Sequence, residues 1–170
     1  GNSLFVATGY SGTILTSSDG VTWTSRTSGT SRSFGGGVAY GNSIFVATGE
    51  YGTILTSSDG TSWTSRTSGT SNSLDGDITY GNSLFVATGD SGTILTSSDG
   101  TSWDNRTSGT TNNLEGGVAY GNGIFVATGW SGNILTSSDN GTSWDNRTSG
   151  TTTHLTGAVS YGNSIFVATG

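Results

Sequence analysis

The sequence predicts an all-β repeat protein, and three observations support this fold class. Gly-Asn followed by Phe-Val-Ala-Thr-Gly begins at residues 1, 41, 81, 121 and 162, which is a period of about 40 residues. Short apolar runs alternate with Gly, Asn, Ser and Asp, the residues that form tight turns. No run shows the 3.6-residue apolar period of a helix. The chain is therefore expected to be one repeat domain, 1–170, with repeats 1–40, 41–80, 81–120 and 121–161 and a partial fifth at 162–170.

One repeat contains four strand-like runs, each ended by turn residues. In the second repeat, turns are predicted at Gly41-Asn42, at Gly49–Gly52 and at Ser58–Gly60. Residues 68–75 then cross to the next repeat. The four predicted strands are Gly37–Tyr40, Ser43–Thr48, Thr53–Ser57 and Thr61–Thr67.

Four short antiparallel strands in about 40 residues are the dimensions of one β-propeller blade. A four-stranded sheet cannot bury both of its faces alone, so each blade must pack against its neighbours. Ile44, Phe45 and Val46, with Ile54 and Leu55, are expected to fill the space between blades. A β-solenoid is the alternative, but its coils are shorter and need no repeated tight hairpins.

The turn before each fourth strand has a regular motif. Residues 137–144 read S-S-D-N-G-T-S-W, and copies at 17–23, 57–63 and 97–103 lack the residue between Asp and Gly. The motif resembles the Asp-box, or BNR repeat, of sialidase-like, sortilin-like and photosystem II assembly-factor-like propellers, over essentially the whole chain. The resemblance implies a structural role, in which Asp accepts turn N–H groups and Trp packs between blades; a Ca²⁺ site is the alternative. The residues concerned are Ser17, Asp19, Trp23, Ser57, Asp59, Trp63, Ser97, Asp99, Trp103, Ser137, Asp139, Gly141 and Trp144.

Composition narrows the partners. The formal net charge is -6, all five basic residues are Arg, and no Cys is present. Without a basic patch, neither nucleic acid nor an anionic membrane surface is an expected partner. No apolar segment reaches the length of a membrane span, and no metal or cofactor site is expected. A surface rich in Ser, Thr, Gly and Asn without Lys favours an extracellular or cell-surface location.

The sequence gives no sign of catalytic machinery, so a non-enzymatic protein is predicted. A sialidase-like site would need a triad of arginines, but four of the five recur at one position of the fourth strand, which indicates a rim or interblade hydrogen-bonding role: Arg26, Arg66, Arg106 and Arg147. Arg32 is the irregular fifth. His154 is the single His and is expected on the solvated surface, as are Asp75 and Asp77, the close acidic pair outside the repeated motifs.

Differences between repeats indicate where binding could occur. Variation is concentrated in the turn after the second strand and in the crossovers 31–35, 71–75, 111–115 and 151–156, which an up-and-down blade places at one end. Loops on a rigid scaffold commonly bind ligands. We therefore hypothesise a carbohydrate or protein ligand at Tyr10, Tyr51, Asp90 and Trp130. Neutral drift of exposed loops is the alternative.

The two ends of the sequence suggest a second function. Residues 1–9 and 162–170 are nearly identical, so a four-bladed ring in which Gly157–Tyr161 completes the blade begun at Asn2 would leave one strand surplus. Two chains could instead share an eight-bladed ring, or exchange terminal strands into an oligomer or fibre. Self-association is therefore an expected partner interaction. Alternatively, the 170 residues could be one segment of a longer array.

Overall fold

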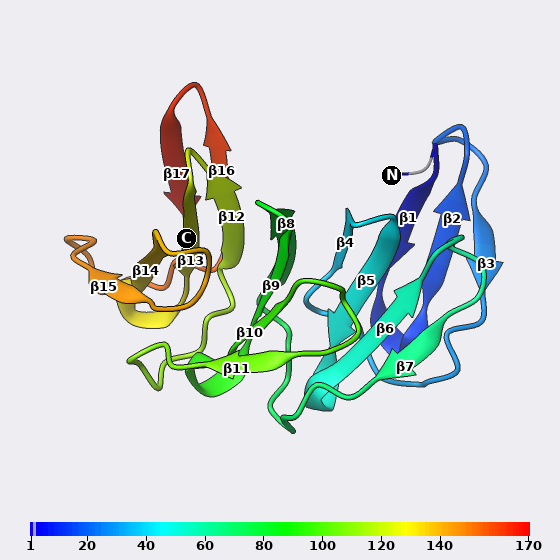
Figure 1. The fold of residues 1–170 in the computed structure, drawn as a ribbon, viewed down its shortest axis with the longest axis horizontal. Helices are drawn as coiled ribbons and strands as arrows, with labels where there is room; N and C mark the ends of the chain where they lie inside the picture. The colour runs from blue at the N-terminus through cyan, green and yellow to red at the C-terminus, as the bar shows by residue number, and fades with distance from the viewer. Residues whose placement is uncertain (2) are drawn as a thin grey trace.

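The computed structural model describes Gly1 and residues 3–170, which form five antiparallel sheets, numbered here as blades 1 to 5 (Figure 1). Blade 1 contains β1 (Phe5–Thr8), β2 (Ile14–Ser17) and β3 (Thr24–Arg26); blade 2 contains β4 (Val38–Gly41), β5 (Ile44–Gly49), β6 (Thr53–Ser57) and β7 (Thr64–Arg66). Blade 3 contains β8 (Asp77–Gly81), β9 (Leu84–Thr88), β10 (Ile94–Ser97) and β11 (Asp104–Arg106). Blade 4 contains β12 (Gly117–Gly121), β13 (Ile124–Thr128), β14 (Ile134–Ser137) and β15 (Asp145–Arg147), and blade 5 is the hairpin of β16 (Ala158–Gly162) and β17 (Ile165–Thr169).

Four short 3-10 turns join the second and third strands of blades 1 to 4: η1 (Tyr10–Gly12), η2 (Glu50–Gly52), η3 (Asp90–Gly92) and η4 (Trp130–Gly132). Within blades 2 to 4, every strand pairs antiparallel with its sequence neighbours. The prediction of an all-β propeller built from four-stranded blades is confirmed. In the described part of the chain, no helix is long and apolar enough to cross a membrane.

The hairpin between the first and second strands differs from the predicted one. Gly41 pairs with Ile44, so the two turn residues are Asn42 and Ser43, with φ of 46° and 63°, and the prediction of Gly41-Asn42 was wrong by one residue. Gly41 is needed for packing instead. A β-carbon there would overlap the ring of Tyr80 in the next blade.

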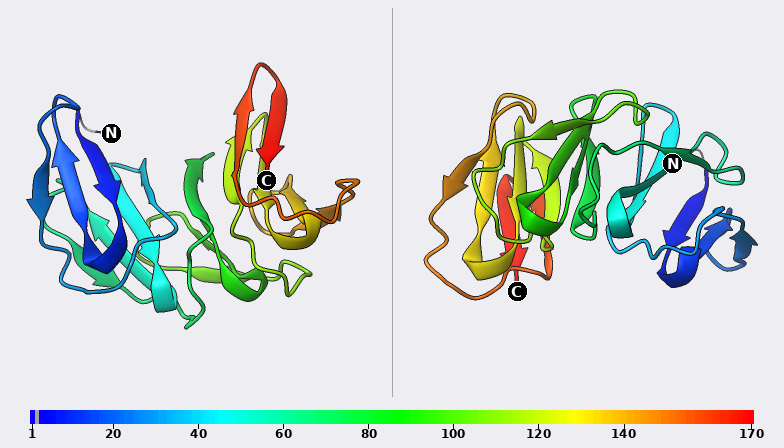
Figure 2. Two further views of the ribbon diagram at one scale, coloured as in Figure 1. Left: turned by 180° about the vertical axis from the view of Figure 1, so that it is seen from behind. Right: turned by 90° about the horizontal axis from the view of Figure 1, so that it is seen from below.

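The blades follow one another in an open arc, with the first strands β4, β8, β12 and β16 in sequential contact along its inner side (Figures 1 and 2). The sheet β1-β2-β3 and the hairpin β16-β17 are separate sheets at the two ends of the arc. The chain therefore does not close on itself as a four-bladed ring. Asn2, where the expected closing blade would begin, lies outside the described residues.

The hydrophobic core lies between adjacent blades, as the sequence predicts. One cluster joins Val46 and Ile54 of blade 2 to Phe85 and Leu95 of blade 3, with Leu74 from the crossover between them. Equivalent clusters lie between blades 1 and 2 and between blades 3 and 4. Because each blade is covered by the next, the arc is a rigid support for the loops at its ends.

Candidate functional site

The variable turns and crossovers lie at one end of the blades and are called here the loop face: η1 to η4 and the crossovers 31–35, 71–75, 111–115 and 151–156. The first three crossovers are each hydrogen-bonded to two adjacent blades through their backbones, and the fourth is bonded to blade 4 from Leu155 N to Gly129 O at 3.0 Å. The Leu74 N–H donates to Gly49 O of blade 2 at 3.0 Å, and the Ser73 carbonyl accepts from Asp90 N of blade 3 at 2.9 Å. The predicted grouping of these loops at one end of the blades is therefore correct.

Each 3-10 turn holds its second residue in the left-handed region, at φ between 53° and 56°: Ser11, Tyr51, Ser91 and Ser131. Crossover side chains accept the N–H groups of these residues, as in Ser91 N to Asn113 Oδ1 at 2.9 Å and Ser131 N to His154 Nδ1 at 3.0 Å. Tyr51 is the bulky residue in this set, and its conformation costs on the order of 1 kcal/mol. The conformation itself belongs to the repeat, since Ser adopts it in the other three turns.

A hydrogen-bonded network connects blades 3 and 4 on the loop face. Asn113 Nδ2 donates to Asp90 Oδ1 at 3.0 Å and to Glu115 Oε1 at 2.8 Å, and Trp130 Nε1 donates to Glu115 Oε2 at 2.9 Å. The Trp130 ring stacks on His154 at 4.9 Å between centroids and 8° between planes. Trp130 remains 40% exposed. The network thus holds an aromatic plate open to solvent.

Negative charge is concentrated beside this plate. Burial and the nearby Glu115 carboxyl raise the pKa of Asp90 to about 6, with a smaller contribution from Asp75. Burial and then the charge of Glu50 raise the pKa of Asp75. These four side chains, Glu50, Asp75, Asp90 and Glu115, are called here the acidic row. A ligand that brings positive charge would relieve their mutual repulsion.

The structure brings together some of the predicted site residues and separates others. Asp90 and Trp130 belong to the network, whereas Tyr51 lies under the guanidinium of Arg32, 4.1 Å from its ring centroid to Arg32 Cζ. Tyr10 projects from blade 1 and is 83% exposed. The loop face is therefore a row of separate elements rather than a single cavity.

The sequence analysis did not identify five residues of the loop face as site residues: Arg32, Asp75, Asn113, Glu115 and His154. A signal was present, since each stands at a crossover position that other repeats fill differently. His154 is exposed, as expected, but its ring stacks on Trp130.

The expectation that Asp77 is a solvated loop residue was wrong. Asp77 begins strand β8, and its carboxylate accepts from Ile78 N at 2.7 Å and from Val118 N of the next blade at 3.3 Å. Burial raises its pKa. Asp77 therefore connects blades 3 and 4 near the inner side of the arc.

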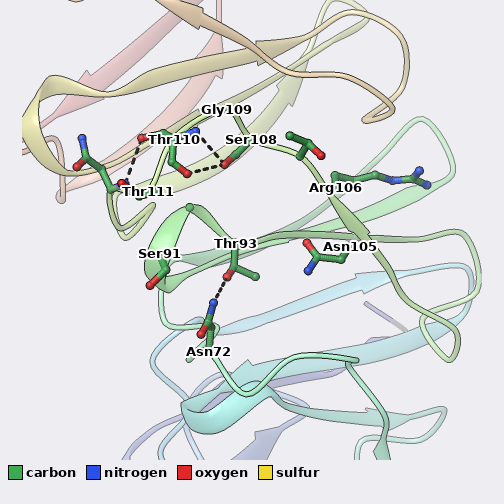
Figure 3. Close-up of a pocket in the computed structure, with 12 residues that line it drawn as sticks. Asn72, Ser91, Thr93, Asn105, Arg106, Ser108, Gly109, Thr110 and Thr111 are labelled. Atoms are coloured by element: carbon green, nitrogen blue, oxygen red, sulfur yellow. Dashed lines mark hydrogen bonds between the residues drawn. The ribbon is translucent and has the colours of Figure 1, made fainter.

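Two polar grooves lie beside the loop face at equivalent places in blades 3 and 4, with volumes of about 620 and 610 Å³. Figure 3 shows the blade 3 groove, where Asn72 Nδ2 donates to Thr93 Oγ1 at 2.9 Å. The Ser108 hydroxyl donates to the Thr110 carbonyl of its own loop, and the Thr110 hydroxyl accepts from Asn112 N and from Asn133 Nδ2 of blade 4. The grooves are mostly lined by residues common to the repeats, so they do not distinguish one blade from another.

The constant turns at the opposite end are held by local hydrogen bonds. In blade 3, Asp99 Oδ1 accepts from Thr101 N at 2.7 Å and Ser102 N at 2.8 Å, while Ser97 Oγ donates to the same oxygen at 3.0 Å. Such bonds hold the pKa of Asp99 well below its usual range and lower that of Asp19 to about 2. No group of three or more metal-ligating acids, His or Cys occurs among residues 1 and 3–170.

The arginines of the fourth strands bond within their own blades. Arg66 Nε donates to Thr56 Oγ1 at 2.8 Å, and the other three repeats contain the same bond at 2.7 to 2.8 Å. The expected rim position is correct, but the partner of this Nε lies on the adjacent strand of the same sheet. These guanidinium groups stiffen the outer strands and do not converge on one site.

Solved structures with the same arrangement of blades include two of YCF48. The structure of YCF48 bound to D1 peptide matches 83% of this chain and 48% of its own at a TM-score of 0.61 and 21% identity. The structure of YCF48 from Cyanidioschyzon merolae matches 94% of this chain and 56% of its own, at a TM-score of 0.63 and 17% identity. The structure of the GH74 enzyme of Niastella koreensis matches 84% of this chain and 22% of its own, at a TM-score of 0.55 and 25% identity.

The chain thus spans about half the length of the YCF48 structures, and the likeness to them establishes the propeller fold. No protein-family model and no curated protein sequence matches this chain.

Proposed function

We propose that this protein is a non-enzymatic binding module whose loop face holds an extended, basic segment of another protein. The observation that carries the proposal is the network of Asp90, Asn113, Glu115 and Trp130, which holds an exposed aromatic plate beside a row of carboxylates. Arg and Lys side chains pair with carboxylates and stack on aromatic rings. The peptide bound to YCF48, a protein of similar fold, supports a peptide as the class of ligand.

The differences between the repeats also support the loop face as the binding region. Crossover backbones are fixed by hydrogen bonds common to the blades, while the side chains above them differ from blade to blade. Common residues supply the scaffold and unequal residues supply the ligand contacts. We also propose that the Ser-x-Asp turns are Asp-boxes with a purely structural role, because their carboxylates are already occupied by turn N–H groups.

The test uses fluorescein-labelled 12-residue Gly/Ser peptides that carry no Arg, two Arg or four Arg, with anisotropy as the readout. Affinity is expected to rise with the number of Arg and to fall between 25 and 200 mM salt, because salt screens charge pairs at a surface. Trp130→Ala is expected to weaken binding by at least about 10-fold, which corresponds to about 1.4 kcal/mol.

Trp23→Ala is the matched control, since Trp23 is 41% exposed but lies in a constant turn at the other end of its blade. Its affinity should remain at the wild-type value. Equal affinity for peptides without Arg and with four Arg, or equal losses in the two Trp variants, would reject a basic peptide ligand on this face.

A glycan is the second candidate ligand. The Trp130 plate, flanked by the polar groups of Glu115 and His154, suits the C–H face and hydroxyls of a sugar ring. A glycan array probed with the wild type and Trp130→Ala separates the two classes. Glycan binding that requires Trp130, without affinity for the Arg peptides, would favour the sugar.

Self-association is the second candidate function. Exposed apolar strands at both ends of the arc favour it, because such strands pair readily with other chains.

A further inference from the structure

The two ends of the arc expose surfaces that are buried at every internal position. Phe5 is 57% exposed, whereas its repeat equivalent Phe45 is 2% exposed. At the other end, Ile165 and Val167 are 59% and 57% exposed, although Val46, the equivalent of Val167, is fully buried. The same short sequence is therefore covered inside the arc and uncovered at its ends.

The internal interfaces show what covers these surfaces. The Gly of each constant turn packs on the second strand of the preceding blade: a β-carbon on Gly100 would lie 2.6 Å from Ile44 Cδ1 and 3.0 Å from Val46 Cγ2. The equivalent Gly141 would approach Leu84 Cδ2 to 2.9 Å. Gly20, in blade 1, meets no preceding blade, and its nearest such contact is Phe5 of its own blade at 3.7 Å. One end thus lacks a preceding blade.

The other end lacks a following blade. A Tyr from the next blade lies against the Gly that ends the first strand, as Tyr80 does on Gly41 and Tyr161 on Gly121. Gly162 has no such neighbour within 4 Å. Blade 5 consists of a first and a second strand, and blade 1 of a second, third and fourth strand. Together, blades 5 and 1 therefore supply the four strands of one complete blade and one additional second strand.

We infer, on the basis of the self-association proposed above, that a second copy of this chain covers these surfaces by strand replacement. β17 of one copy takes the position of β1 on β2 of the other, and β16 enters with it as the missing first strand. Residues 1–9 and 162–170 differ only in Leu4 and Ile165, so Val167 can face Thr16 in the register that Val6 now occupies.

The exchange conserves strand pairing and adds packing between blades of the two copies. β1 forms four residue pairs with β2, which β17 can restore. β16 keeps its five pairs with β17, and it gives Gly162 the Tyr40 side chain that now covers Gly1. In the completed blade, Gly20 of one copy lies against the second strand of blade 4 of the other copy, just as Gly141 lies against the second strand of blade 3 within one copy.

Two copies related in this way form a closed ring. Each contributes three whole blades, and the two junctions contribute one composite blade each, which gives eight blades and two displaced β1 strands. The open arc of Figure 1 leaves room for a second arc facing it. The YCF48 propellers, of which this chain matches 48% and 56%, are about twice as long as the matched part.

The test is the molar mass of the 170-residue chain by light scattering across a concentration series, with a matched pair of variants. The wild type is expected to have twice the sequence mass of 17.1 kDa. Phe166→Ser removes a ring that becomes buried in the ring-shaped dimer, so the dissociation constant should rise at least about 100-fold. Phe5→Ser changes the equivalent residue of the displaced strand and should leave the dissociation constant unchanged or lower it, because it weakens only the strand that the exchange displaces.

Deletions of residues 1–9 and 162–170 repeat the comparison without a point change, and circular dichroism confirms that each variant keeps its strands. The chain without residues 1–9 should still form the dimer, whereas the chain without residues 162–170 should be monomeric. A 17.1 kDa monomer up to about 100 μM would refute self-association itself. A dimer that is insensitive to both variants, or lost only in Phe5→Ser, refutes the replacement of β1 while leaving self-association intact.

Discussion

Replacement of Asp90 by Asn tests the physical basis of the loop face. Asp90 lies in η3, accepts from Asn113 Nδ2 at 3.0 Å, and has its pKa raised to about 6 by burial and by the Glu115 carboxyl. Asn keeps the size of the side chain and its Oδ1 acceptor but removes the charge. The substitution therefore isolates the electrostatic cost of the acidic row.

The sign follows from proton linkage. The folded-state pKa of Asp90 lies above its ordinary value of 3.8, so the folded protein binds a proton more tightly than the unfolded chain. The favourable contribution of Asp90 protonation to the free energy of unfolding is complete below about pH 3.8 and is lost as the pH rises through about 6. A rise of about two pKa units corresponds to about 3 kcal/mol at full transmission. Because Asp90 is only partly buried, solvent screening reduces this to about 1 kcal/mol.

Urea unfolding followed by Trp fluorescence at pH 7.5 and at pH 4 measures the effect. Asp90→Asn is expected to raise the free energy of unfolding by about 1 kcal/mol at pH 7.5 and to leave it nearly unchanged at pH 4. Asp104→Asn is the control, since Asp104 forms an exposed ion pair with Arg106 at 2.9 Å and its loss should destabilise slightly. Destabilisation by Asp90→Asn at pH 7.5 would refute the reasoning.

Three further predictions concern the core, the strained turn and the constant turns. Phe85→Ala, at a fully buried ring, should lower the free energy of unfolding by about 3 to 5 kcal/mol in urea melts, whereas Phe5→Ala at the exposed equivalent should cost less than half as much. Tyr51→Ser, which restores the residue of the sister turns, should change the unfolding free energy by less than about 1 kcal/mol yet weaken Arg-peptide binding in anisotropy titrations. Asp59→Asn should destabilise the protein at pH 7, because the turn N–H groups lower the pKa of Asp59. The deficit should begin to shrink as the pH falls past the ordinary Asp pKa of 3.8 and should be lost as the pH falls through the lowered folded-state pKa; a deficit that does not change with pH would contradict this.

Strand order and blade size could be predicted from the sequence because turn residues recur at fixed intervals and mark every strand end. The hairpin position could not, because Gly41 satisfies two demands equally well on paper, positive φ and close packing, and the ring of Tyr80 decides between them. Asp77 was misplaced for a related reason. Its partner, Val118 N, lies 41 residues away in the next blade, so local sequence does not reveal it.

Ring closure is the clearest example of a property that the repeated sequence cannot determine. Phe5 and Phe45 stand in nearly identical segments, yet one is exposed and the other buried, because the covering residues belong to a different blade. On the loop face, comparison of the repeats identified Asp90 and Trp130 as unusual. It did not show that Asn113 and Glu115 connect them, since this connection depends on the crossover lying between two adjacent turns.

The two proposals reinforce each other physically. In a ring of two copies, strand replacement keeps each acidic row on its own blades 2 to 4, so one assembly displays two such rows at the same end. A partner with two basic segments could then bind both, and the second contact would form at an effective concentration set by the linker between the segments. Burial and the repulsion from Glu115 raise the pKa of Asp90 and cost each chain stability, and a bound cation would recover part of that cost at both rows. Titration of the wild type and Phe166→Ser with a tandem Arg peptide should show this gain in the dimer, and equal affinities in the two would disprove such coupling.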